Sequence, residues 1–198
     1  MRVLSNSNKN EINLPMSDFN KKEEPNAANS SAESPGPSQE FITALQELYC
    51  AEMKKLKFLP ALEHLAEHED LRDAFRDHLL ILDQHIARLA EVFRITATPP
   101  AEKECDEVDT IVQQGLRVSK EVPERSVFRD LKYITAAQSY QKYELSAYRK
   151  LAELAPEAGY PEAAELFTPG IFECEETILD LADISKWIED DVATGEPQ

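Results

Sequence analysis

Apolar residues recur every three or four positions along nearly the whole chain after residue 38, and this periodicity limits the fold more than any other feature. Such a spacing places side chains on one face of an α-helix, whereas a half-buried strand needs strict alternation. Strand patterns of that kind are almost absent. The sequence therefore predicts an all-α protein whose helices each bury one face.

The pattern predicts long helices at about residues 38–68, 70–93, 125–154 and 161–190. Ser38 is the N-cap candidate of the first helix, which should continue past Pro60 with a kink. We expect the fourth helix to be broken at residues 168–170 ("TPG"), because proline lacks a backbone donor and glycine adds flexibility.

Two short connections and one long one set the expected topology. The connection between the second and third helices is about thirty residues long and carries a shorter helix at about 101–120. The third and fourth helices are joined by a compact turn, "APEAGYP". Two helical hairpins joined by one long crossover predict a ferritin-like four-helix bundle.

The ends of the chain differ from the predicted bundle. Residues 1–38 are rich in Asn, Ser, Glu and Pro and too poor in aliphatic residues to offset the entropy of ordering them. They are expected to form a disordered, acidic and polar tail, which could dock an unknown protein partner although no motif marks one. The bundle domain is predicted at 39–190, followed by a flexible C-terminus at 191–198.

Charge and cysteine content exclude several classes of function. The 198 residues include 21 Lys and Arg against 38 Asp and Glu, a net charge of −17, which disfavours nucleic acid and anionic membranes as partners. Three widely spaced cysteines are typical of free thiols in a reducing compartment. No apolar run is long enough to span a bilayer and no secretory leader is recognisable, so the expected location is the cytoplasm.

Polar residues on the apolar stripes are the candidates for chemistry, because ferritin-like bundles can hold two metal ions with inward carboxylates and histidines. Glu52 lies in an unbroken stripe running from Phe41 to Leu59, and carboxylates are rarely buried without a partner. Asp83 is the acid on the inward flank of the second helix. Glu144 lies beside the stripe of the third helix, and Glu173 flanks that of the fourth.

The histidines have simpler interpretations. His78 and His85 lie seven positions apart on one helix face and are interpreted as hydrogen-bonded core or rim residues. His64 and His68 are spaced to bind one metal ion, but their setting is more typical of a solvated helix end. Cys174 on the inward line of the fourth helix is interpreted as a small buried hydrophobic residue.

Four sequence words resemble the YciE/YciF family of ferritin-like, stress-associated bacterial proteins: "FITALQELYCAEMKKLKFLPAL", "LRDAFRDHL…RLAEVF", "AAQSYQKYELSAYRKLAELA" and "GYPEAAELF". The likeness covers about residues 40–185. It implies a four-helix bundle, usually a dimer, with a di-metal carboxylate site of poorly defined activity.

The site implied by the resemblance is only partly present. The first-helix glutamate matches Glu52 and the last glutamate of the third-helix word matches Glu144. The second-helix glutamate falls on Leu80 and its i+3 partner on Asp83. In the third-helix word Gln141 and Lys142 replace a glutamate and a histidine, and in the fourth helix Cys174 and Ile178 lie on the inward line. Leu80 and Ile178 cannot bind metal and are expected to turn the centre into ordinary core.

We therefore expect a non-catalytic homodimer with a structural, regulatory or interaction role and no cofactor. The alternative is an oxidoreductase or metal-binding protein that holds iron or manganese through Glu52, Asp83, Glu144 and Glu173. A third interpretation is a cation-buffering acidic surface, for which net charge is weak support.

Overall fold

The computed structural model describes residues 37–101, 103–122 and 126–194, and these form five helices without a strand. The helices are α1 (Pro37–Leu65), α2 (Glu69–Ile95), α3 (Asp106–Glu121), α4 (Val127–Glu157) and α5 (Pro161–Thr194). The predicted all-α class is confirmed, and α1, α2, α4 and α5 are the four long helices that the periodicity indicates.

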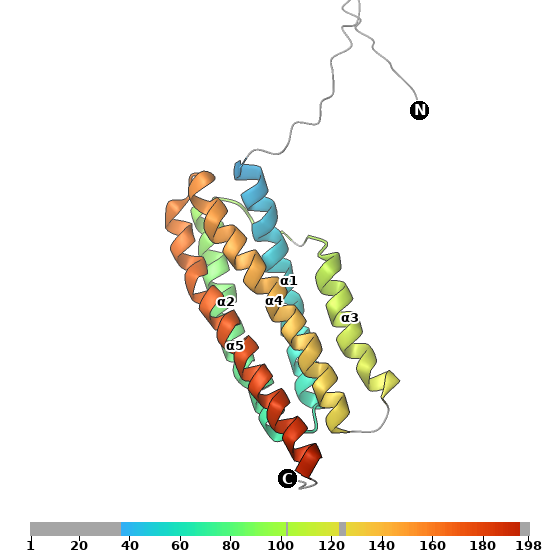
Figure 1. Cartoon of the computed structure of the whole chain (residues 1–198). Coiled ribbons are helices and arrows are strands. Elements are labelled where there is room, and N and C mark those ends of the chain that lie inside the picture. Colours follow the sequence, from blue (N-terminus) through green and yellow to red (C-terminus); the bar gives the residue numbers. More distant parts are fainter. Residues whose placement is uncertain (1–36, 102, 123–125, 195–198) are drawn as a thin grey trace, which may run out of the picture. The chain divides into compact units, whose positions relative to one another are not determined.

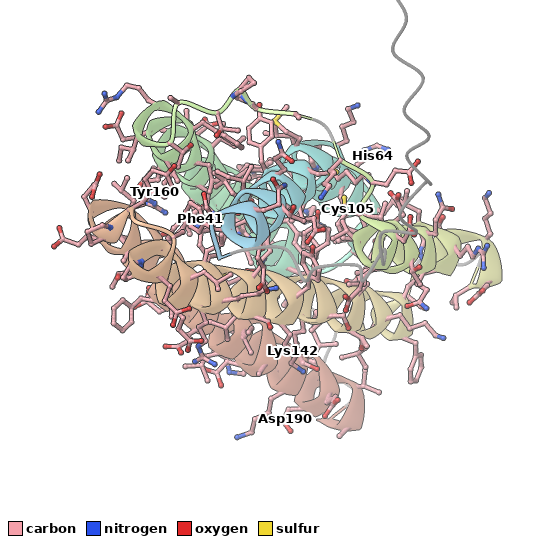
Figure 2. The ribbon with its side chains drawn as sticks, turned by 90° about the horizontal axis from the view of Figure 1, so that it is seen from above. Phe41, His64, Cys105, Lys142, Tyr160 and Asp190 are labelled. Carbon is pink, nitrogen blue, oxygen red and sulfur yellow. The ribbon has the colours of Figure 1, made fainter. Side chains whose placement is uncertain are left out.

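The helices form the predicted ferritin-like bundle (Figure 1). α1 packs against α2 and α4, and α5 packs against α4 and α2, so the four long helices form a closed ring of neighbours. α2 and α4 run in the same direction, as a long crossover requires. The crossover helix α3 packs against α1 and α4, and Figure 2 shows Cys105, just before α3, beside α1.

Both prolines that lie well inside a predicted helix are accommodated without ending it. α1 continues through the exposed Pro60, as predicted, and α5 continues through the exposed Pro169. The prediction that α5 breaks at 168–170 is therefore wrong. A missing N–H on the solvent side of a long helix leaves the buried face and its packing intact, so tertiary contacts outweigh the local preference.

Gly170 has a packing role in α5 that the sequence did not reveal. A Cβ atom at this position would lie 2.7 Å from Cε1 of the Tyr148 ring on α4. The hydroxyl of Tyr148 donates a hydrogen bond of 2.7 Å to Glu52, which holds the ring in place. The glycine allows α4 and α5 to approach closely around this ring.

The turn between α4 and α5 ends α4 with a Schellman motif, in agreement with the predicted compact turn. The N–H of Tyr160 donates to the carbonyl of Ala155 at 2.8 Å, and the N–H of Gly159 donates to that of Pro156 at 3.1 Å. Gly159 has a φ of +91°, which favours glycine. The Tyr160 ring then stacks on Phe41 of α1 at 5.7 Å between ring centroids and closes this end of the bundle (Figure 2).

The bundle boundaries lie close to those expected. α1 begins at Pro37, one residue before Ser38, whereas α5 continues to Thr194, past the predicted domain end at residue 190. The proposed disordered tail lies outside the described residues, except for its last two positions, which are helical. The final residues, 195–198, also lie outside them.

The close contact at Gly170 makes a testable prediction. Gly170→Ala should lower the free energy of unfolding by about 1–3 kcal/mol, because the methyl group overlaps a fixed aromatic ring. Alanine favours the helix by about 1 kcal/mol over glycine, so helix propensity alone would raise stability. A lower free energy of unfolding, measured by urea denaturation, therefore reports the overlap. Pro169→Ala, at the exposed neighbouring position, is the control and should leave stability unchanged or raise it. A stabilised Gly170→Ala variant would contradict the packing role.

A buried ion-pair centre as the candidate functional site

A layer of polar side chains divides the apolar core of the bundle into two clusters. One cluster includes Phe58, Leu82 and Tyr140, and the other includes Leu48 and Leu89. The buried polar residues at the boundary between these clusters are Glu52, His85, Gln141 and Glu144, and the buried Lys55 and His78 join them from within the span of the first cluster. Buried charges are unfavourable unless paired, so the contacts among these residues decide what the layer can do.

Lys55 on α1 is the central cation of the layer. Its side chain is 1% exposed, and its Nζ donates a hydrogen bond of 2.6 Å to Oε2 of Glu144 on α4. The same Nζ forms an ion pair of 3.0 Å with Oε2 of Glu52, one helical turn earlier. The Tyr140 ring lies 5.9 Å from the ammonium and adds a cation–π contact. One ammonium is thus shared by two buried carboxylates.

His85 on α2 continues the ion pairs toward α5. Its Nδ1 lies 2.9 Å from Oε1 of Glu52, and its Nε2 lies 2.9 Å from Oε2 of Glu173. Both carboxylates can only accept when ionised, so both ring nitrogens donate and His85 is an imidazolium ion. Glu173 also accepts from Arg88 at the edge of the layer. The sequence pattern predicts His85 only as a hydrogen-bonded core or rim residue, without this role in an ion pair.

Together these contacts form a chain of charges of alternating sign. In order they are Glu144, Lys55, Glu52, His85, Glu173 and Arg88, three acids and three bases. Each of the four long helices contributes at least one member: α1, α2, α4 and α5. The chain, called here the ion-pair chain, therefore joins all four at one level and is neutral when every member is charged.

Tyr148 and the pair of His78 and Gln141 complete the polar layer. The Tyr148 hydroxyl donates to Oε1 of Glu52 at 2.7 Å, and the ring lies edge-on to His85 at 5.3 Å. Nε2 of His78 and Nε2 of Gln141 are 3.2 Å apart, so the amide N–H donates to a neutral imidazole. Burial, followed by the charges of Lys55 and His85, holds the pKa of His78 well below its usual value.

The two central carboxylates have opposite pKa shifts. Burial alone would raise the pKa of Glu52, but the charges of Lys55 and His85 and the hydrogen bonds from His85 and Tyr148 outweigh it and lower the pKa. Burial raises the pKa of Glu144 to about 8, helped by repulsion from Glu52 and only partly offset by Lys55. Nζ of Lys55 lies nearer Glu144, yet the pKa of Glu144 is the one that rises. The two adjacent carboxylates share one ammonium, and only Glu52 is in contact with a second cation, His85.

The basic members of the chain are held in their charged forms. Burial alone would lower the pKa of Lys55, but the carboxylates of Glu144 and Glu52 raise it. Burial would likewise lower the pKa of His85, but the charge of Glu52 and the hydrogen bonds to Glu173 and Glu52 raise it. Burial would raise the pKa of Glu173, yet hydrogen bonds from His85 and Arg88 lower it.

Three of the four predicted site residues meet in this chain and one does not. Glu52, Glu144 and Glu173 are linked through Lys55 and His85, whereas Asp83 is exposed. The prediction that Asp83 lies on the inward flank is wrong. The inward line of α2 instead passes through His78, Leu82 and His85. The imidazole rings of the two histidines can be buried because they find hydrogen-bond partners on other helices.

The expectation that Leu80 and Ile178 fill the centre is also corrected. Leu80 is 65% exposed and Ile178 is half-buried. The centre is filled by charge, with Lys55 as its main occupant. Most other interpretations agree with the structure: His78 and His85 are hydrogen-bonded core residues, His64 is exposed, and Cys174 is fully buried among apolar residues, whereas His68 is half-buried at the start of α2.

Lys55 is the functional residue that sequence analysis missed. It lies at i+3 from Glu52, so a stripe traced through Leu48, Glu52 and Lys55 is as regular as the one traced through Leu56. A lysine in that position pairs naturally with the glutamate one turn earlier. That spacing was the available signal, although it also fits an exposed helix face.

The residues present do not fit a di-metal centre. Glu52 and Glu144 already face the ammonium of Lys55, and both nitrogens of His85 face carboxylates. In the described part of the chain, no three His, Cys, Asp or Glu side chains are arranged to hold a metal ion. The position of a central cation is taken by the protein's own side chain.

The fold and the ion-pair chain define a ferritin-like helical bundle with a salt-bridged centre. Residues 37–190 match the family described as "Domain of unknown function (DUF892)", and the chain belongs to this family. It is 30% identical over 146 residues to Protein YciF of Escherichia coli K12, covering 73% of this chain and 87% of that protein. The predicted resemblance to the YciE/YciF family is thus confirmed.

Two solved structures share the fold. The E. coli stress protein YciF has a TM-score of 0.75 at 26% identity, covering 79% of this chain and 99% of its own. YcfI from Rhodopseudomonas palustris has a TM-score of 0.72 at 23% identity, covering 77% of this chain and 96% of its own. Among the described helices, none is long and apolar enough to cross a membrane.

The raised pKa of Glu144 predicts a pH-dependent stability. Unfolded Glu and His release their protons near pH 4.5 and 6.5, whereas the folded protein retains both to higher pH. Glu144 keeps its proton only in the folded state across this window, and the opposite pKa shifts of His85 and His78 offset one another, so stability should fall, on the order of 1–3 kcal/mol, between pH 6 and pH 9. Urea denaturation at both values measures the change, and Glu144→Gln should make it smaller. An equal loss in that variant would contradict the shift at Glu144.

Proposed function

We propose that the protein is a non-catalytic, stress-associated structural protein in which the di-metal position of a ferritin-like bundle is degenerate. The observation that supports this is Lys55, whose ammonium is paired with Glu52 and Glu144 in the core. An ammonium supplies positive charge but has no coordination position for a substrate or for oxygen. The stress association rests on the likeness to YciF, which is called a stress protein.

A cytoplasmic location belongs to this proposal. Cys50, Cys105 and Cys174 are all free and buried, which fits a reducing compartment. Burial raises the pKa of Cys105 to about 12, an effect strengthened by Cys50 and reduced by Lys54, so this thiol is unsuited to redox chemistry.

The alternative is a di-metal carboxylate protein that uses iron or manganese for oxidoreductase chemistry or storage. Its support is that Glu52 and Glu144 are fully buried at the centre of a ferritin-like bundle. It requires a rearranged site, because Asp83 is exposed and Lys55 would have to leave the two carboxylates. The geometry favours the non-catalytic function.

Metal content tests the choice between these functions. Protein without a histidine tag, produced with iron, manganese and zinc supplied, should contain no stoichiometric metal by elemental analysis, because Lys55 neutralises the carboxylates. Glu52→Ala should give the same result. Near two equivalents of iron or manganese per chain, lost in Glu52→Ala, would overturn the proposal in favour of the di-metal alternative.

A homodimer formed through α2 and α5 is the second part of the proposal. The crossover helix α3 covers the side of the bundle formed by α1 and α4, and no other described helix covers the opposite side. Of the six large hydrophobic residues that are exposed in the described part of the chain, Leu80 lies on α2, and four lie on α5: Phe172, Leu179, Trp187 and Val192. An uncovered side rich in exposed apolar residues supports an interface between two copies.

Oligomeric state tests the dimer. Light scattering after size exclusion should give about twice the 22.4 kDa chain mass for the wild type and the monomer mass for Leu179→Glu. Phe128→Glu is a matched control, because Phe128 is 64% exposed on α4 and Leu179 is 65% exposed on α5. A monomeric wild type, or dissociation by both substitutions alike, would contradict an α2–α5 interface.

A further inference from the structure

The ion-pair layer contains more buried acceptor oxygens than its donors satisfy. Oε2 of Glu52, Oε1 of Glu144 and Oε1 of Gln141 accept no hydrogen bond from any described residue. Nζ of Lys55 lies 3.0 Å from Oε2 of Glu52, an ion pair outside hydrogen-bond geometry. An ammonium has three N–H donors in fixed directions, whereas a metal ion attracts oxygen ligands from several directions at once. Such an oxygen-rich surrounding is better matched to a metal ion than to an ammonium.

Only one of the two carboxylate distances around Nζ falls at the upper limit for a coordinated cation. Nζ lies 2.6 Å from Glu144 and 3.0 Å from Glu52, while divalent ions bind oxygen at about 2.0–2.6 Å. A small movement of either carboxylate would bring both into coordination range. The two carboxylates come from α1 and α4, so the position lies between helices that already pack together.

His85 contacts one of the two carboxylates, Glu52, and could be recruited as a third ligand by a rearrangement once the ammonium is removed. Its Nδ1 points to Glu52, and its Nε2 contacts Glu173 at 2.9 Å. A histidine that binds metal through one nitrogen usually donates the other to a carboxylate, which fixes the ring orientation. Glu173 would supply that partner. Two carboxylates and one imidazole form a donor set suited to Zn²⁺, Fe²⁺ or Mn²⁺.

We propose that Lys55 is a built-in cation that fills a latent divalent-metal position, and that removing its side chain alone creates a metal site from Glu52, Glu144 and His85. This inference rests on the proposed function, in which the native chain holds no metal. It deepens that function by identifying the one residue that excludes the ion.

The test uses the full chain, stripped with chelator and then loaded with Zn²⁺. Lys55→Ala should retain about one equivalent of zinc after desalting and should gain several degrees in thermal midpoint when Zn²⁺ is added. The wild type should show neither effect. Lys54→Ala is the matched control: it removes the same charge from the adjacent residue, whose partner is Asp109 outside the ion-pair layer, and it should retain no zinc.

Folding of the variant is part of the readout. Lys55→Ala leaves Glu52 and Glu144 without their shared counter-charge, so loss of helicity in chelator and its recovery with Zn²⁺ would also support the proposal. The double variant Lys55→Ala/Glu144→Gln removes one of the two charges. It should fold without metal and bind Zn²⁺ at least about tenfold more weakly than Lys55→Ala, because a carboxylate ligand is lost.

Any of three results would overturn the inference. The first is that neither Lys55→Ala nor Lys55→Ala/Glu144→Gln retains zinc. The others are that Zn²⁺ fails to restore helicity to an unfolded Lys55→Ala, or that Lys54→Ala retains as much zinc as Lys55→Ala. These outcomes can be told apart from failure of the proposed function. If the wild type and the variants all lack metal, only the inference is contradicted. If the wild type contains stoichiometric metal, the proposed function itself is contradicted.

Discussion

The pairing of Lys55 with Glu52 and Glu144 is the constraint on which the bundle depends. Removing an ion from water costs several kcal/mol, so each buried charge must face an opposite one at short range. His85 and Glu173 extend the same requirement to α2 and α5. Apolar packing alone would allow the helices to shift along one another, whereas an ion-pair chain with members on all four fixes their relative positions. The absence of a side chain at Gly170 leaves room for the Tyr148 ring, whose hydroxyl donates to Glu52 and so adds a further contact to the buried charges.

An ammonium and a metal ion satisfy buried carboxylates in different ways. A metal neutralises them and can also bind a further ligand, which gives it chemistry. Lys55 neutralises them and is itself part of the chain, so the centre is complete as soon as the protein folds. Under the proposed function, the bundle would gain independence from metal supply and lose the open coordination position that catalysis uses. This exchange is consistent with the structural role proposed for this chain.

Sequence periodicity predicted the helices, the crossover and the ferritin-like topology, because these depend on apolar spacing and connection length. It placed Glu52 inward correctly and Asp83 wrongly, and it put Glu144 beside the stripe although that side chain is fully buried. Adjacent positions on a helix differ by about 100°, so Leu80, Asp83 and His85 cannot be ordered by burial from spacing alone. Whether His85 is buried depends on Glu52 and Glu173, which lie 33 and 88 residues away in sequence. Lys55 was missed for the same reason: its carboxylate partner Glu144 is 89 residues distant.

The division of the apolar core into two clusters also has a consequence for cooperativity. One cluster contains Val108 and Val118 of α3, whereas the other, which includes Phe41 and Phe167, receives no residue from that helix. The two ends of the bundle therefore differ in local stability and communicate through the polar layer between them. Amide protons at the end that lacks α3 should open to solvent first, with the ion-pair level as the boundary where local opening stops.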